Sequence, residues 1–171
     1  MAEPFVVLPW KRSRALDVVC KKVTVLASQD DTHGYERFFH DGARGTGPPP
    51  PCHDWDESFF VLKGSAQFGI DRREMLATPG TLVHLPAGTE HWFRFESDEG
   101  QLLTVTGSGS GAAAFFPQVD ADVSDGSDIE GLAVGAGSTG SRLLPLARSA
   151  QFKSSGDAVR EDTSGSAPTN P

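Results

Sequence analysis

The sequence has no long apolar run. No stretch of its 171 residues approaches the ~18–20 uninterrupted apolar residues that a membrane-spanning helix requires. The N-terminus offers only the run Phe5–Leu8, which Pro9 follows at once, and this predicts that no secretory signal is present. We therefore expect no association with a membrane.

Cysteine is also scarce. The two cysteines, Cys20 and Cys52, cannot form the disulfide framework of a small secreted domain. A chain without such a framework is typical of a reducing compartment, so we expect a cytoplasmic location. A single bond between the two cysteines is the alternative.

Basic charge is in deficit. The chain carries 15 basic and 23 acidic residues, a net charge of −8. Such a surface repels phosphate backbones, and no basic stripe with interleaved aromatic residues occurs. Nucleic acid is therefore not an expected partner.

Glycine and proline are plentiful, with 19 and 12 residues, and they separate many short β-prone segments. No long helical pattern lies between these segments, which favours an all-β antiparallel sandwich or barrel. The expected strands are residues 18–27, 35–40, 57–63, 65–70, 81–85, 91–95 and 101–106.

The composition divides the chain into four parts. Residues 1–16 are predicted to be an irregular lead-in, and residues 17–107 the barrel. Residues 108–146 are predicted to be a linker with short helices at 112–123 and 128–136. Residues 147–171 are rich in Ser, Gly, Asp and Thr and lack apolar periodicity, so we expect a disordered tail.

Two segments carry residues suited to metal binding. In the first, His53 and Glu57 lie four residues apart, so on an extended chain their side chains share a face, which Phe59 and Val61 continue. In the second, His91 follows a Pro-Ala-Gly-Thr turn and begins a strand, and Phe93 and Phe95 share its face. If both faces line one interior, two imidazoles and a carboxylate meet between aromatic walls. This ligand set suits a divalent transition metal and leaves three positions open in octahedral iron.

These two segments resemble the two motifs of the cupin family. The first motif, G-x5-H-x-H-x3,4-E-x6-G, is matched from Gly45 to Gly64, and the second, G-x5-P-x-G-x2-H-x3-N, from Gly80 to Phe95. The resemblance covers roughly residues 17–107. It implies a cupin double-stranded β-helix, a jelly-roll barrel of the small single-domain type, and it implies that His53, Glu57 and His91 are the metal ligands.

Two positions depart from the family pattern. Pro51 stands where the family has its first metal-binding histidine, and Phe95 stands where it has its closing asparagine. Three ligand candidates remain in place of four. Cys52 is a possible extra donor, because a thiolate can replace an imidazole, but a structural thiol is the simpler interpretation.

The resemblance implies a metal-dependent enzyme that acts on a small, largely apolar organic molecule, with oxygenase chemistry as the first hypothesis. Iron(II) is the preferred metal, with Mn²⁺, Ni²⁺ or Zn²⁺ as alternatives, and Glu57 could also shuttle a proton. A second hypothesis is a non-redox isomerase, cyclase or lyase. A third is a metal-free barrel that binds a small ligand, in which the metal site has decayed. The family also implies a homodimer.

The remaining aromatic residues and histidines are open to simpler interpretations. Phe59, Val61, Phe93 and Phe95 could shape a substrate pocket, or they could fill the barrel core. We expect His84 to have a structural role. His33 and His40 are expected to lie at strand edges and to have no catalytic role.

Overall fold

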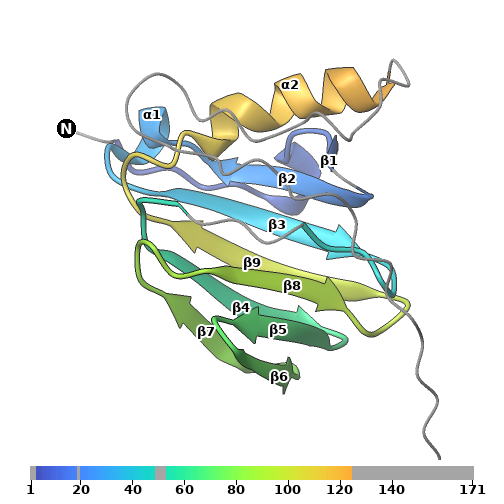
Figure 1. The fold of residues 1–171 in the computed structure, drawn as a ribbon. Coiled ribbons are helices and arrows are strands. Elements are labelled where there is room, and N and C mark those ends of the chain that lie inside the picture. Colours follow the sequence, from blue (N-terminus) through green and yellow to red (C-terminus); the bar gives the residue numbers. More distant parts are fainter. Residues whose placement is uncertain (1–2, 19, 49–52, 125–171) are drawn as a thin grey trace, which may run out of the picture.

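The computed structural model describes residues 3–18, 20–48 and 53–124 (Figure 1). Two antiparallel sheets face one another. The larger sheet has the strand order β1-β2-β3-β9-β4-β7, and the smaller has the order β6-β5-β8. The strands are β1 (Leu16–Val18), β2 (Lys21–Ala27), β3 (Glu36–Gly42), β4 (Glu57–Lys63), β5 (Ala66–Ile70), β6 (Arg73–Ala77), β7 (Leu82–Leu85), β8 (His91–Phe95) and β9 (Gly100–Thr106). The predicted all-β jelly-roll class is confirmed.

Alternation of apolar and polar residues gives the larger sheet a buried inner face. Along β9, Leu102, Thr104 and Thr106 are buried while the residues between them are partly exposed. The apolar core lies between this face and the smaller sheet, where Phe68, Phe93 and Phe95 are buried. The core therefore holds the two sheets together by apolar contact.

The helix α2 (Ala112–Ser124) covers the part of the inner face that the smaller sheet leaves open, beside β1 and β2 (Figure 1). Val119 of α2 packs with Val18, Val23 and Phe38 in a second apolar cluster. The inner face of the larger sheet is thus covered by β8 in one part and by α2 in another.

Buried carboxylates attach both ends of α2. At its N-terminus, Glu36 accepts hydrogen bonds from the backbone N–H of Ala112, 2.9 Å away, and from the hydroxyl of Ser110. Near its C-terminus, Asp120 accepts from Arg14 at 2.6 Å and from the backbone N–H of Asp17 at 2.6 Å. A carboxylate at a helix N-terminus satisfies free N–H groups and interacts favourably with the helix dipole.

The structure differs from the sequence prediction in four elements. The single strand expected at residues 18–27 is divided into β1 and β2, which pair with one another in antiparallel orientation. The segment Arg73–Ala77, which lies between two expected strands and was not itself predicted as a strand, forms β6. The connection between the strands expected at 18–27 and 35–40 contains one helical turn, α1 (Gln29–Thr32), with a capping box between Ser28 and Asp31. A short 3₁₀ turn occurs at Pro9–Lys11 within the lead-in. The predicted helix at 112–123 is present as α2, whereas the predicted helix at 128–136 and the predicted tail lie outside the described residues.

None of the helices among the described residues is long and apolar enough to cross a membrane.

Candidate metal centre

His53 reaches the barrel interior from a turn before β4 and not from a strand. The turn is fixed by the imidazole itself, because Nδ1–H of His53 donates to the carbonyl oxygen of Trp55 at 2.9 Å. The indole of Trp55 stacks on the imidazole with ring centroids 4.3 Å apart and planes 2° apart. The predicted shared face of His53 and Glu57 is thus achieved by a turn that the same-face argument did not anticipate.

His91 begins β8 and is buried, with 2% of its side chain exposed. Its Nδ1–H donates to the carbonyl oxygen of Thr89 at 2.9 Å. Both imidazoles therefore use Nδ1 as the donor to a backbone carbonyl, and this directs Nε2 of each toward the interior.

The two Nε2 atoms converge on one carboxylate oxygen. Oε2 of Glu57 lies 3.1 Å from Nε2 of His53 and 3.3 Å from Nε2 of His91. One ligand atom from each of the three residues lies within 4.8 Å of the others. The structure brings together the three side chains that the sequence singled out.

The electrostatics of this cluster favour a cation. Burial raises the pKa of Glu57, but the hydrogen bonds from His53 and His91 and the attraction of the two imidazoles lower it more, to about 2. Burial lowers the pKa of His91, but the bonds to Glu57 and Thr89 raise it above its ordinary value. The carboxylate is therefore ionised, and positive charge is stabilised beside it.

The residues present fit a metal ion. With Nδ1 carrying the proton, Nε2 of a neutral imidazole holds a lone pair, and two such lone pairs and an anionic oxygen repel one another unless a proton or a metal cation lies between them. A histidine ligand in metalloproteins typically donates its second ring N–H to a carbonyl or carboxylate, as His53 and His91 both do. The donor set of two imidazoles and a carboxylate suits Fe²⁺, Mn²⁺ or Zn²⁺.

Two hydrogen bonds join the turn that carries His53 to the turn before His91. The backbone N–H of Gly88 donates to the carbonyl oxygen of His53 at 2.7 Å. The backbone N–H of Ala87 donates to Oδ1 of Asp56 at 2.9 Å. Gly88 has a φ of +81°, a conformation that glycine adopts without strain. The distance between the two imidazoles therefore depends on this contact between turns.

The residues predicted to shape a substrate pocket lie in the packed core. Phe59, Val61, Phe93 and Phe95 each expose 2% or less of their surface. Phe59 borders the metal centre, with its ring centroid 6.3 Å from that of His91. Phe95 lies at the opposite end of β8, against Gly42 and Gly100, where an added Cβ would collide with its ring. Whether these residues also contact a substrate stays a prediction.

The other histidines differ in their environments. His84 is exposed on β7 and shares a hydrogen bond of 2.9 Å with Ser58, and its structural role stays a prediction. The expectation that His40 lies at a strand edge is wrong, because β3 continues to Gly42 and places His40 on its buried face. The alternation of Glu36, Phe38 and His40 would have indicated this burial.

Residues 51 and 52 lie outside the described residues. They are Pro51, which stands at the position of a histidine in the cupin motif, and Cys52, the predicted extra donor. The structure therefore gives three candidate ligands, and the prediction for Cys52 stays open.

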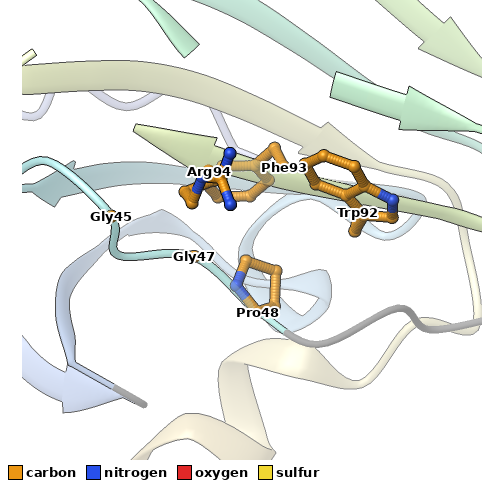
Figure 2. A pocket seen from close by; sticks show the side chains of 6 residues that line it. All are labelled: Gly45, Gly47, Pro48, Trp92, Phe93 and Arg94. Atoms are coloured by element: carbon orange, nitrogen blue, oxygen red, sulfur yellow. The ribbon is translucent and has the colours of Figure 1, made fainter. Parts of the chain in front are cut away.

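A separate surface pocket of about 250 Å³ lies on the outer side of β8 (Figure 2). It is lined by Gly45, Gly47, Pro48, Trp92, Phe93 and Arg94. Trp92 and Arg94 alternate with His91 and Phe93 along β8, and therefore face away from the metal centre. At Gly47 the loop lies so close to β8 that an added Cβ would be 1.9 Å from the carbonyl oxygen of Phe93. This pocket is no part of the candidate centre.

Comparisons with known proteins agree with this architecture. Residues 38–106 match the family model described as Cupin domain. Over 89 residues the chain is 30% identical to quercetin 2,3-dioxygenase of Bacillus subtilis (strain 168), and the match covers 51% of this chain and 26% of that enzyme. The chain thus spans about a quarter of the length of this relative.

Solved structures show the same fold at low identity. The structure of KdgF from Halomonas sp. matches with a TM-score of 0.57 and 15% identity, covering 61% of this chain and 94% of that one. An RmlC-like cupin from Shewanella frigidimarina matches with a TM-score of 0.55 and 14% identity, covering 61% and 91%. The polyketide cyclase RemF from Streptomyces resistomycificus matches with a TM-score of 0.53 and 19% identity, covering 61% and 80%.

Proposed function

We propose that this chain, whose residues 38–106 match the Cupin domain, is a metal-dependent enzyme of the cupin family acting on a small, largely apolar organic molecule. The observation that carries the proposal is the convergence of two Nε2 atoms on Oε2 of Glu57, at 3.1 and 3.3 Å, while both Nδ1 atoms are held by backbone carbonyls. This arrangement presents lone pairs to one point, which is what a metal ion requires.

We propose oxygenase chemistry as the first candidate. The named dioxygenase relative supports it, and two imidazoles with one carboxylate form the ligand set of non-haem iron oxygenases. A bound Fe²⁺ would supply the redox chemistry and open coordination positions. His53 and His91 would hold the metal, and Glu57 would balance its charge and could take a proton from a substrate hydroxyl group.

The second candidate is non-redox chemistry at the same residues, such as isomerisation, cyclisation or elimination. The observation that favours it is the donor set itself, because two histidines and a glutamate also hold catalytic zinc, which acts as a Lewis acid. Glu57 would again be the base. Stoichiometric oxygen consumption with a turned-over substrate separates the two candidates.

The experiment that tests the proposed centre compares His91→Ala with His84→Ala. Both variants lose one imidazole, but His91 is in the cluster and His84 is exposed on the outer side of β7. After reconstitution with Fe²⁺, Mn²⁺, Ni²⁺ or Zn²⁺ and removal of free metal, we expect stoichiometric metal in the wild type and in His84→Ala, and its loss in His91→Ala.

Elemental analysis gives the metal content, and circular dichroism shows whether the fold is kept. A wild-type protein that retains none of the four metals would favour a metal-free ligand-binding barrel. Equal metal content in His91→Ala and wild type would remove His91 from the centre. Homodimerisation and a cytoplasmic location stay predictions.

A further inference from the structure

A second set of polar side chains lies inside the barrel, beside the metal centre but outside it. Lys21, His40 and Thr104 are buried, with 6%, 5% and 0% of their surface exposed. Among the residues that the structure describes, no hydrogen-bond partner is present for either ring nitrogen of His40 or for Oγ1 of Thr104. Buried polar atoms in folded proteins are rarely left without partners, so each of these atoms calls for an explanation.

Lys21 is the charged member of the set. Within the described part of the chain, its Nζ makes no hydrogen bond or ion pair, and its contact is with the ring of Phe93, at 5.6 Å from the centroid. A cation over an aromatic face recovers only part of the hydration that a buried ammonium loses. Burial lowers the pKa of Lys21 to about 8, so at neutral pH most of the population keeps the charge. The nearby carboxylate of Glu57 is already engaged by two imidazoles.

The strand register places these residues on one diagonal that ends at the metal centre. Lys22 pairs with Asp41, and Val23 pairs with His40, so Lys21 lies one diagonal step from His40 on the neighbouring strand. His40 pairs with Leu102, and Thr104 lies two residues further along β9. Thr104 pairs with Phe59, and Glu57 lies two residues before Phe59 on β4.

Each step of this diagonal joins adjacent strands on the same face. Diagonal neighbours of this kind have Cα atoms about 7–8 Å apart, which long side chains can bridge directly or through a ligand atom. The diagonal therefore connects an unpaired ammonium on β2 to the carboxylate of the metal centre on β4.

The surroundings of the diagonal are aromatic. The ring of His40 contacts Phe93 of β8 at 5.9 Å and Phe116 of α2 at 6.3 Å. It also contacts Phe59 at 6.4 Å. His40 therefore lies where the two covers of the sheet, β8 and α2, meet.

From this arrangement we propose that Lys21, His40 and Thr104 form a binding site for the anionic end of an organic carboxylate whose apolar body lies against the surrounding phenylalanine rings. A carboxylate would neutralise the buried ammonium and accept hydrogen bonds from Lys21, from the ring N–H of His40 and from the hydroxyl of Thr104. The inference rests on the proposed function in one respect, because it assigns the substrate of the metal centre to the organic anions.

The test measures binding of benzoate, cinnamate and hexanoate to the full chain, with benzamide as the uncharged match of benzoate. Isothermal titration calorimetry is done on protein treated with chelator, so that a carboxylate cannot bind through the metal. The test variant is Lys21→Met, which removes the charge at nearly constant length. The matched control is Lys22→Met, because the neighbouring Lys22 is exposed and its ion pair with Asp17 lies on the surface.

We expect at least one of the three carboxylates to bind with equal affinity to the wild type and to Lys22→Met. Its affinity for Lys21→Met should be at least about tenfold lower, and the wild type should bind it more tightly than benzamide. His40→Phe should weaken the same binding while keeping a ring of similar size. Equal affinity in Lys21→Met and wild type would overturn the proposal, and so would binding of benzamide as tight as that of benzoate, or no binding of any carboxylate.

Misfolding and failure of the metal centre are read out separately. Replacing a buried, unpaired charge with an apolar side chain generally stabilises a protein, so the melting temperature of Lys21→Met should equal or exceed that of the wild type. Its metal content after reconstitution should be unchanged. Loss of carboxylate binding in Lys21→Met with full metal retention supports the anion site. Carboxylate binding by a wild type that retains no metal contradicts the proposed metal-dependent enzyme but supports the anion site.

Discussion

The proton on each imidazole decides which cation the candidate metal centre can bind. His53 and His91 each commit Nδ1–H to a backbone carbonyl, so any further proton or metal must bind at Nε2. A metal ion and a proton therefore compete for the same nitrogen atoms. Because the pKa of His91 is raised above its ordinary value of 6.5, a proton occupies Nε2 of the metal-free protein up to a higher pH than in a free imidazole.

We predict that metal affinity rises with pH through neutrality. Each proton that the metal displaces from an imidazole contributes up to about a tenfold change in apparent affinity per pH unit, below the pKa of that imidazole. Titrations with Zn²⁺ between pH 6 and pH 8.5, with a competing chelator of known protonation, measure this slope. A flat profile would show that the imidazoles do not bind the metal.

Lys21 predicts an unusual dependence of stability on alkaline pH. Its pKa is about 8 in the folded protein and 10.5 when unperturbed, so between these values the unfolded chain binds more protons than the folded one. Stability therefore increases as pH rises from 8 to 10.5, by up to about 3 kcal/mol from this residue. Urea unfolding across this pH range measures the free energy of unfolding of the wild type and of Lys21→Met. The value for the wild type should rise relative to that of Lys21→Met as the pH increases. A constant difference would mean that Lys21 is hydrated in the folded state.

At the scale of elements, the candidate metal centre depends on two turns and not on strand geometry alone. Asp56 and the carbonyl oxygen of His53 accept hydrogen bonds from the turn that precedes His91. Neither group is in the ligand cluster, yet together they set where one imidazole lies relative to the other.

We expect Asp56→Ala to weaken metal binding by about 10–100-fold without unfolding the barrel, the range typical of residues that orient metal ligands. Asp54→Ala is the matched control, because Asp54 is an exposed aspartate in the same turn. Metal affinity and the melting temperature are measured for both. If the two variants bind metal equally well, the contact between the turns does not position His53.

The elements that the sequence did not predict have identifiable physical reasons. β6 has four exposed residues in sequence, so no apolar alternation marks it, and its Glu, Met, Leu and Ala are helix-favouring residues. It forms because β5 offers an edge to pair with. In contrast, α1 did carry a signal, since Ser28 and Asp31 have the spacing of a capping box.

At the scale of the whole molecule, α2 is attached to the barrel by a few polar contacts and one apolar cluster. Glu36 is buried and accepts hydrogen bonds from Ser110, Ala112 and Ala113. This one carboxylate joins β3 to the start of α2, more than 70 residues later in the chain. It therefore affects how the whole helix packs on the sheet.

Glu36→Gln should destabilise the protein by about 1–3 kcal/mol, because the neutral amide binds helix N–H groups less strongly and places a donor where acceptors are needed. Glu74→Gln, an exposed change on β6, is the control and should have little effect. Urea unfolding gives the free energies. Equal stability of the two variants would show that Ser110 and the apolar cluster suffice to hold α2.

The overall architecture and the three ligand candidates were accessible from sequence because two spaced motifs and short alternating strands encode them. The diagonal of Lys21, His40 and Thr104 was not, because it arises from the pairing of β2, β3, β9 and β4, which no single segment encodes. His40 in particular required the true end of β3, two residues beyond the predicted one.

This register has a consequence for how the protein could diversify. The residues proposed to bind the metal come from the stretch between His53 and His91, whereas Lys21 and His40 come from the two strands before it. On the proposed assignment, substitutions at these two earlier positions would change which organic anions bind and leave the three candidate metal ligands intact. The two properties are therefore separately mutable, and descendants of one ancestor could exchange substrates by altering only their first strands.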